Sequence, residues 1–323
     1  MMKRFTAMLL VLLSGTGLLL SGCSQPKANE RTSVVCTIFP QYDWVRQILG
    51  DKADNMDITL LLDKKIDLHS YQPSVDDIVK ISACDLFIYV GGESDGWVAD
   101  ALEEATNADM IVINLLDVLG SAAKAEEVIE GMEAEEPDGD LGEEPEYDEH
   151  VWLSLKNARL FCAAIADALT VLDPDNAGAY QSNLAAYIRQ LSTVDAKYQA
   201  TVDAAPVKTI LVGDRFPFRY LADDYGLNYY AAFVGCSAET EASFETIVFL
   251  AKKADELHLK NILVTESSNR AIAETIRGAT GGKDQHILVL NAMQSISQAE
   301  LAGGATYLAI MESNLRVLKE ALQ

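Results

Sequence analysis

The sequence predicts an α/β protein of two lobes, each built on a parallel sheet, joined by one long rigid helix, with a ligand cleft between the lobes. Short apolar strands alternate with helical segments on both sides of a central stretch. Strands that are apolar on both faces and separated by helices are typical of parallel sheets covered on both sides. The central stretch, 176–203, has apolar residues at intervals of three and four, which predicts an amphipathic helix roughly 40 Å long.

The chain opens with an export signal. A short basic region precedes an apolar run over 8–20, and this run is too short and too interrupted by glycine and serine for a membrane-spanning helix. The run ends in Leu-Ser-Gly-Cys, which closes at Cys23. We therefore expect 1–22 to be a lipoprotein signal peptide, Cys23 to be lipidated, and 23–32 to tether the protein to the extracytoplasmic face of the cell membrane. An ordinary signal with an incidental cysteine is the alternative.

Removal of the signal leaves 301 residues, enough for two lobes with cores of their own. It also removes two cationic residues, so the net charge changes from −24 to −26. A surface of this charge repels nucleic acid and anionic lipid, which excludes both as partners apart from the lipid anchor, and it favours cations.

The predicted N-terminal lobe covers 33–172. Runs rich in branched and aromatic residues indicate its strands, and segments of helical periodicity follow them. Strands are expected at 34–39, 56–62, 86–90 and 110–115, and helices at 42–49, 74–81, 97–106 and 155–172.

An acidic stretch, 126–149, interrupts this lobe. It holds thirteen Asp and Glu residues and no Lys or Arg, with glycines and prolines scattered through it. No core can be built from that composition, so we expect a disordered acidic loop. Weak capture of cations and a plain solvated insertion are both open as its role.

The linking helix and the C-terminal lobe complete the chain. Asp173-Pro174 is a strong helix start and Pro206 ends the helix, which places the link at 173–205 and the second lobe at 206–323. In open α/β sheets ligands bind at the carboxyl ends of strands, and both lobes can direct those ends into one cleft. Strands are expected at 209–212, 229–233, 262–265 and 287–290, and helices at 220–225, 243–257, 269–280 and 307–322.

Two histidines occur in loops with acidic neighbours. His69 lies two residues after Asp67, and His150 directly follows Asp148 and Glu149 at the exit of the acidic loop. Imidazole binds borderline divalent metals, and a nearby carboxylate can orient the ring and raise its basicity. Taken singly, a loop histidine is more often a solvated residue than a metal ligand.

The second lobe offers oxygen and sulfur donors. Asp214 follows the strand at 209–212, and Glu266 stands in the same place after 262–265. An acidic side chain at the carboxyl end of a strand is hard to explain by packing, although each carboxylate is also placed to cap the next helix. Cys236 is either a ligand or a buried, inert thiol.

Several segments resemble the metal-binding lipoproteins that feed zinc or manganese to bacterial ABC importers. The most specific are His69-Ser70-Tyr71-Gln72-Pro73, Asp148-Glu149-His150-Val151-Trp152 and the tract before Tyr225-Gly226-Leu227. The C-terminal pattern Gly304, Tyr307, Met311 and Asn314 is similar to a clostridial-type branch. The resemblance runs from about residue 33 to residue 322. It implies two lobes with a long helix between them, metal ligation by His69 and His150, and an ABC permease as the partner of a monomeric carrier.

The family pattern also implies a third and a fourth ligand, and here the sequence departs from it. The segment that starts at Gly213 lacks the usual histidine, so Asp214 is the nearest candidate for the third ligand. Asn291 stands where a carboxylate is usual, so Glu266, Cys236 and Asn291 compete with solvent for the last position. Two imidazoles with carboxylates fit Zn²⁺ and also Mn²⁺, whereas a thiolate favours zinc.

The resemblance therefore implies an extracytoplasmic solute-binding lipoprotein that captures a divalent metal, Zn²⁺ before Mn²⁺, and delivers it to an ABC permease. The sequence has no H-E-x-x-H and no phosphate-binding glycine-rich loop, so we expect no catalytic residues and no enzyme activity. A surface adhesin that uses its metal structurally and a metal-dependent hydrolase are the alternatives.

Overall fold

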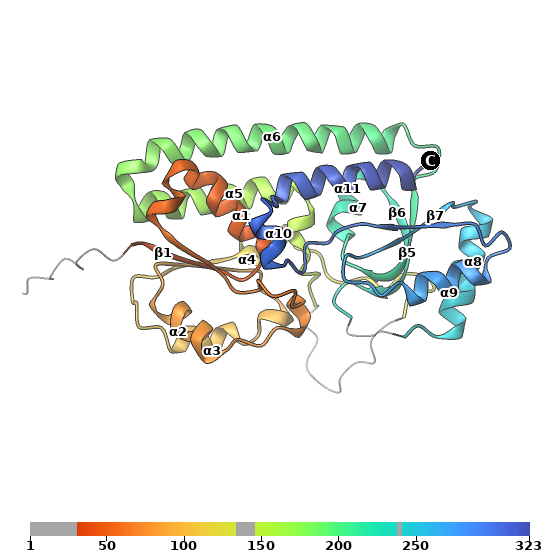
Figure 1. The fold of residues 1–323 in the computed structure, drawn as a ribbon, viewed down its shortest axis with the longest axis horizontal. Helices are drawn as coiled ribbons and strands as arrows, with labels where there is room; N and C mark the ends of the chain where they lie inside the picture. Colours follow the sequence, from red (N-terminus) through yellow and green to blue (C-terminus); the bar gives the residue numbers. More distant parts are fainter. Residues whose placement is uncertain (1–30, 134–145, 238–240) are drawn as a thin grey trace, which may run out of the picture. The chain divides into compact units, whose positions relative to one another are not determined.

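The computed structural model describes residues 31–133, 146–237 and 241–323 (Figure 1). The expected signal peptide, the lipidation site Cys23 and nearly all of the tether lie outside these residues. Residues 32–323 form one compact unit. None of the helices in the described part of the chain is long and apolar enough to cross a membrane.

The first lobe is built on a four-stranded parallel sheet in the order β2-β1-β3-β4. Its inner strand β3 is buried, which explains why its sequence is apolar on both faces. The strands are β1 Ser33–Cys36, β2 Asp57–Leu60, β3 Leu86–Tyr89 and β4 Ile111–Asn114. The helices are α1 Phe39–Leu49, α2 Val75–Ala83, α3 Val98–Glu103, α4 Leu115–Leu119 and α5 Leu155–Leu172. The short helix α4 was not predicted.

The second lobe repeats this plan with the parallel order β6-β5-β7-β8. Its strand β5 is longer than predicted, because it continues past an irregularity in register between Val212 and Arg215. The strands are β5 Thr209–Phe216, β6 Asn228–Val234, β7 Asn261–Val264 and β8 His286–Val289. The helices are α7 Arg219–Tyr225, α8 Phe244–Glu256, α9 Ala271–Ala279, α10 Gln298–Ala302 and α11 Tyr307–Ala321.

The predicted long helix links the lobes. It is α6, Ala177–Asp203, and a 3-10 turn at Pro174–Asn176 precedes it. Its buried face follows the predicted periodicity, with Tyr180, Leu184, Tyr187, Leu191, Val194, Tyr198 and Val202.

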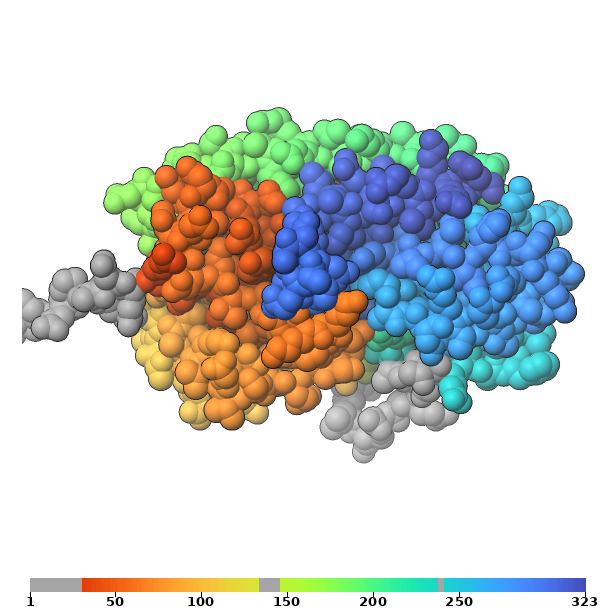
Figure 2. Space-filling view, in the orientation of Figure 1, coloured from red at the N-terminus to blue at the C-terminus, as the bar shows by residue number. Residues whose placement is uncertain are grey.

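The chain also crosses between the lobes a second time, which the sequence did not predict. After β8 it passes to the first lobe, where the Lys65 amide donates to the Ile296 carbonyl at 3.1 Å, and α10 lies against this lobe (Figure 2). Helix α11 then returns beside α6, and the Tyr198 hydroxyl donates to the Met311 carbonyl at 2.7 Å. One hydrophobic cluster contains residues of both lobes, from Val34 to Leu322. The two lobes are therefore connected by more than the linking helix α6.

The flanks of the predicted acidic loop have definite structure. Glu133 forms a bridge with Phe233 of β6, Ala125 forms one with Tyr147, and Met132 is buried. The prediction of a structureless loop is therefore wrong for 126–133 and 146–149, because backbone pairing and the apolar Met132 anchor them to the body. Residues 134–145 lie outside the described part of the chain.

Candidate metal centre

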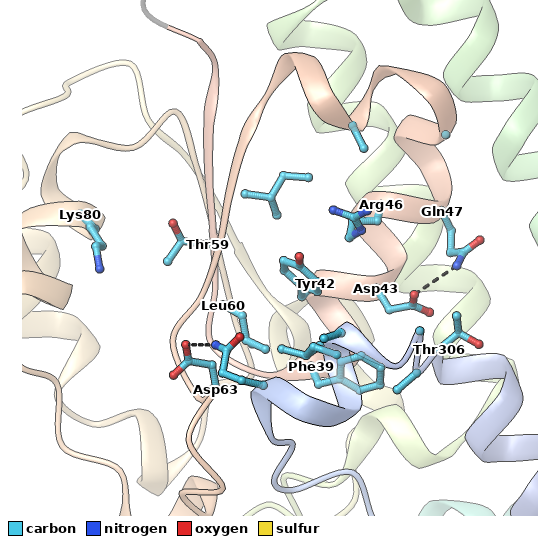
Figure 3. Close-up of a pocket in the computed structure, with 18 residues that line it drawn as sticks. Phe39, Tyr42, Asp43, Arg46, Gln47, Thr59, Leu60, Asp63, Lys80 and Thr306 are labelled. Carbon is cyan, nitrogen blue, oxygen red and sulfur yellow. Dashed lines mark hydrogen bonds between the residues drawn. The ribbon is translucent and has the colours of Figure 1, made fainter.

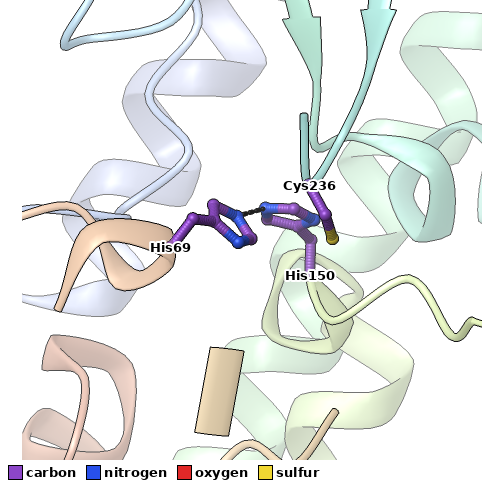
Figure 4. A group of neighbouring side chains, drawn as sticks. All are labelled: His69, His150 and Cys236. Carbon is purple, nitrogen blue, oxygen red and sulfur yellow. Dashed lines mark hydrogen bonds between the residues drawn. The ribbon is translucent and has the colours of Figure 1, made fainter. Parts of the chain in front are cut away.

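Three potential ligands converge between the lobes. Nitrogen atoms of His69 and His150 and the sulfur of Cys236 all lie within 4.8 Å of one another (Figure 4). His69 lies in a 3-10 turn of the first lobe, His150 immediately precedes another, and Cys236 follows strand β6 of the second lobe. This is the one group of three or more such side chains found among the described residues.

Hydrogen bonds orient both imidazole rings. The Nδ1 atom of His150 lies 3.0 Å from a carboxylate oxygen of Asp148, and Nδ1 of His69 lies 2.8 Å from the Ser94 hydroxyl. An ionised carboxylate only accepts, so the proton of neutral His150 is on Nδ1 and the ring's lone pair is on Nε2. The two Nε2 atoms are 3.2 Å apart. This arrangement presents both imidazoles to one ion, each with a supporting partner behind it.

Gln294 was not predicted as a site residue, and it lies between the two histidines. Its Nε2 atom is 2.7 Å from Nε2 of His150 and 3.2 Å from Nε2 of His69. The side chain is buried, and its Oε1 has no hydrogen-bond partner among the described residues. The only sequence signal was its place three residues after Asn291, in the segment where the family pattern implies a ligand.

The predicted candidates Glu266 and Asn291 shape the loop that holds Gln294. The carboxylate of Glu266 accepts from the backbone amides of Ala292 at 2.7 Å and Gln294 at 3.0 Å. The Asn291 side chain accepts from the Met293 amide at 2.8 Å. Glu266 is not among the three grouped side chains, and its oxygen atoms, like the side-chain oxygen of Asn291, accept from backbone amides of the loop.

Asp214 also lies outside the group of His69, His150 and Cys236, and its carboxylate is hydrogen-bonded within β5 and to the end of β7. One carboxylate oxygen accepts from the Thr265 hydroxyl at 2.8 Å and amide at 3.2 Å, and the other accepts from the Arg215 amide at 2.8 Å. The sequence placed Asp214 after the end of its strand, but β5 continues to Phe216. Its carboxylate therefore ties β5 to the end of β7.

Burial shifts the pKa values of His69 and Cys236. Desolvation and the neighbouring His150 lower the pKa of His69 to about 3, so its ring is neutral at physiological pH. Burial, followed by the carboxylates of Glu149, Asp148 and Glu126, raises the pKa of the Cys236 thiol well above its ordinary value. A metal ion that bound here would therefore displace the thiol proton.

A pocket of about 750 Å³ in the first lobe is separate from this centre. It lies beside α1, β2 and α10, and its lining includes Asp43 and Arg46 (Figure 3). The Asp43 carboxylate accepts from the Gln47 side chain at 3.1 Å and from the Tyr307 amide at 2.9 Å. The pocket contains none of the grouped ligands, and its buried acid is already bonded within the fold.

Comparisons with known proteins agree with this architecture. The family model described as ZnuA, zinc-uptake complex component A, periplasmic, matches residues 34–321. The zinc-binding lipoprotein AdcA of Streptococcus pneumoniae is 31% identical over 315 residues, which are 96% of this chain and 60% of AdcA, so the chain spans about 60% of that relative. The high-affinity zinc uptake protein ZnuA of Bacillus subtilis is 30% identical over 93% of this chain and 90% of its own.

Solved structures show the same fold. The Zn(II)-bound ZnuA-like domain of Streptococcus pneumoniae AdcA is 27% identical, with a TM-score of 0.70, and the match covers 91% of this chain and 99% of that domain. The metal-dependent lipoprotein YcdH of Bacillus subtilis is 29% identical, with a TM-score of 0.71, over 90% of this chain and 99% of its own. The sequence match and the shared fold lead to one conclusion: this chain belongs to the ZnuA family of zinc-uptake component A proteins.

Proposed function

We propose that this protein captures Zn²⁺ outside the cytoplasmic membrane and delivers it to an ABC permease. The observation that supports this most is the convergence of His69, His150 and Cys236 within 4.8 Å. The zinc-binding names of the relatives point to the same cargo. In this proposal the lipid on Cys23 keeps a monomeric carrier beside its importer.

The donor set favours zinc over manganese. Two imidazoles and one thiolate are borderline and soft donors, which zinc prefers, whereas manganese prefers oxygen ligands. We assign the fourth position to Gln294. Rotation of its amide by half a turn would replace Nε2 with Oε1, the buried oxygen that has no partner among the described residues, at the same point between the imidazoles.

Capture and release follow from the division of ligands between the lobes. The histidines belong to the first lobe, whereas Cys236 and Gln294 belong to the second. A tilt of one lobe against the other changes the distance between the two ligand pairs, so closed and open forms differ in affinity for the ion. The shared core and the second crossing of the chain restrict this motion to small tilts.

Zinc content of the purified protein tests the function. We expect one Zn²⁺ per chain by native mass spectrometry, retained against excess Mn²⁺ and lost in His150→Ala. The matched control is His258→Ala, which removes an exposed histidine far along the chain from the centre. For delivery, cells that lack the protein should fail to grow in zinc-depleted medium and recover with the wild-type gene or added zinc. Full zinc retention by His150→Ala would refute the proposal.

A further inference from the structure

Arg215 connects the two segments that position ligands from opposite lobes. Its Nη2 lies 2.6 Å from a carboxylate oxygen of Asp67, and its Nη1 donates to the Ser237 carbonyl at 3.4 Å. Asp67 belongs to the loop of His69 in the first lobe, and Ser237 directly follows Cys236 in the second. The Arg215 guanidinium group therefore bridges the loop that carries His69 and the turn that carries Cys236.

Asp67 links Arg215 to the backbone of His69. Its second carboxylate oxygen accepts from the His69 backbone amide at 3.1 Å and begins the 3-10 turn that holds the imidazole. The Asp67 and Arg215 side chains are 19% and 15% exposed, so water screens their pairing less than it screens a surface ion pair. Loss of Arg215 would leave this carboxylate without its partner from the other lobe.

The local structure of β5 fixes the direction of Arg215. Side chains alternate between the faces of a strand, and the irregularity between Val212 and Arg215 shifts that alternation by disrupting the register. Asp214 accepts the Arg215 amide at 2.8 Å and holds Thr265 of β7 with its other oxygen. The planar fork of arginine suits this place, because it donates to two separate acceptors at once.

We propose that Arg215 is a positioning residue that clamps the His69 loop to the Cys236 turn and thereby slows release of the metal. This inference rests on the proposed function of the same centre. The clamp also places a cation near a divalent ion, which is unfavourable unless Asp67 balances its charge. The pair is therefore expected to act as a unit, and removal of Asp67 alone is expected to harm binding more than removal of Arg215 alone.

The variants that test the clamp are R215M, R215K, D67N and D67N/R215M in the full chain. We expect zinc to dissociate from R215M into excess chelator about tenfold faster than from wild type, in the range seen when residues behind a ligand are removed. R215K should recover part of this change, because it restores the charge with a single contact. D67N should release zinc fastest, and the double variant should release it more slowly than D67N.

R159M is the matched control. Arg159 pairs with Asp195 at 3.1 Å, at 27% and 18% exposure, between α5 and α6, and its loss should leave the dissociation rate within twofold of wild type. A second readout needs no metal: hydrogen exchange of the 66–71 segment in chelator-treated protein should be faster in R215M, because the acceptor of the His69 amide is released. If hydrogen exchange of this segment and the zinc dissociation rate were both unchanged in R215M, the clamp would be refuted while the proposed function would stand. A wild-type protein that binds no zinc would overturn the proposed function itself.

Discussion

The two lobes share one sheet plan but contribute different side chains to the proposed metal centre. The first lobe presents two imidazoles from short turns, each held from behind by Asp148 or Ser94. The second lobe presents a thiol and an amide, while its acids Asp214 and Glu266 bond to the backbone of neighbouring segments. Strand ends leave backbone amides that need acceptors. A carboxylate at such an end can therefore be a brace, which here means a side chain that accepts hydrogen bonds from neighbouring backbone amides, as readily as it can be a metal ligand.

The distinction between ligand and brace predicts the largest effect at His150. This side chain is fully buried, and His150→Ala removes its imidazole nitrogen from the proposed ligand set. We expect zinc affinity to fall by about three orders of magnitude, or about 4 kcal/mol, in competition with a chromophoric chelator. A loss of less than about threefold would mean that the first lobe does not supply the ligands.

Cys236→Ser tests whether the second lobe supplies a true ligand. A hydroxyl is a poor substitute for a thiolate on zinc, so affinity should fall by about 100-fold, or roughly 3 kcal/mol, and the preference for zinc over manganese should narrow. Cobalt-loaded protein should lose its sulfur-to-metal charge-transfer absorption at the same time. Persistence of that absorption in the variant would rule out Cys236 as a ligand.

Glu266→Gln separates a brace from a ligand. The amide of the variant keeps one acceptor for the loop of Gln294 but loses the charge. Zinc affinity should therefore fall by only about tenfold, which is the low end of the loss in metal affinity expected when a residue that supports a ligand is changed. Asp214→Asn should behave similarly, because Asp214 bonds Thr265 and Arg215. If either variant matched the loss seen in His150→Ala, the distinction between the two kinds of acid would fail.

The first lobe has a brace of its own in Asp95, and its expected effect is the smallest. Asp95 accepts from the amides of Val90 at 2.8 Å and Gly91 at 3.0 Å, and burial raises its pKa to about 6. Because this pKa exceeds its unfolded value, the folded state binds more protons between about pH 4 and pH 6. The contribution of Asp95 to stability is therefore full at low pH and is lost as the pH rises through this window.

Urea denaturation of chelator-treated protein measures this effect. Relative to Asp95→Asn, the wild-type free energy of unfolding should decline by up to about 3 kcal/mol between pH 4 and pH 6. Parallel pH profiles for the two proteins would show that Asp95 is ionised in both the folded and the unfolded state, which would contradict the role of burial.

Most of the fold could be predicted because periodicity reflects burial directly. Helix α5 matches its predicted bounds, and α6 begins one residue after the predicted start. The extension of β5 through Asp214 and the second crossing of the chain could not be predicted. Both depend on long-range pairing, in which polar residues are placed by partners distant in the sequence.

The histidines of the centre could be predicted, since imidazoles are rare here and two of them follow acidic residues in loops. Cys236 remained one of several candidates because a thiol has no local signature that separates a ligand from a buried residue. Gln294 was missed because a neutral amide is chemically unremarkable in sequence. Only the placement of its loop by Glu266 brings it to the histidines.

X-ray absorption of the zinc-loaded protein tests the central claim most directly, namely that imidazoles of one lobe and the thiolate of the other hold a single ion. We expect one sulfur at about 2.3 Å and two imidazole nitrogens at about 2.0–2.1 Å from zinc. In Cys236→Ser the sulfur shell should disappear while the two imidazoles remain. A wild-type spectrum with only oxygen and nitrogen neighbours, or without imidazole scattering, would contradict the account.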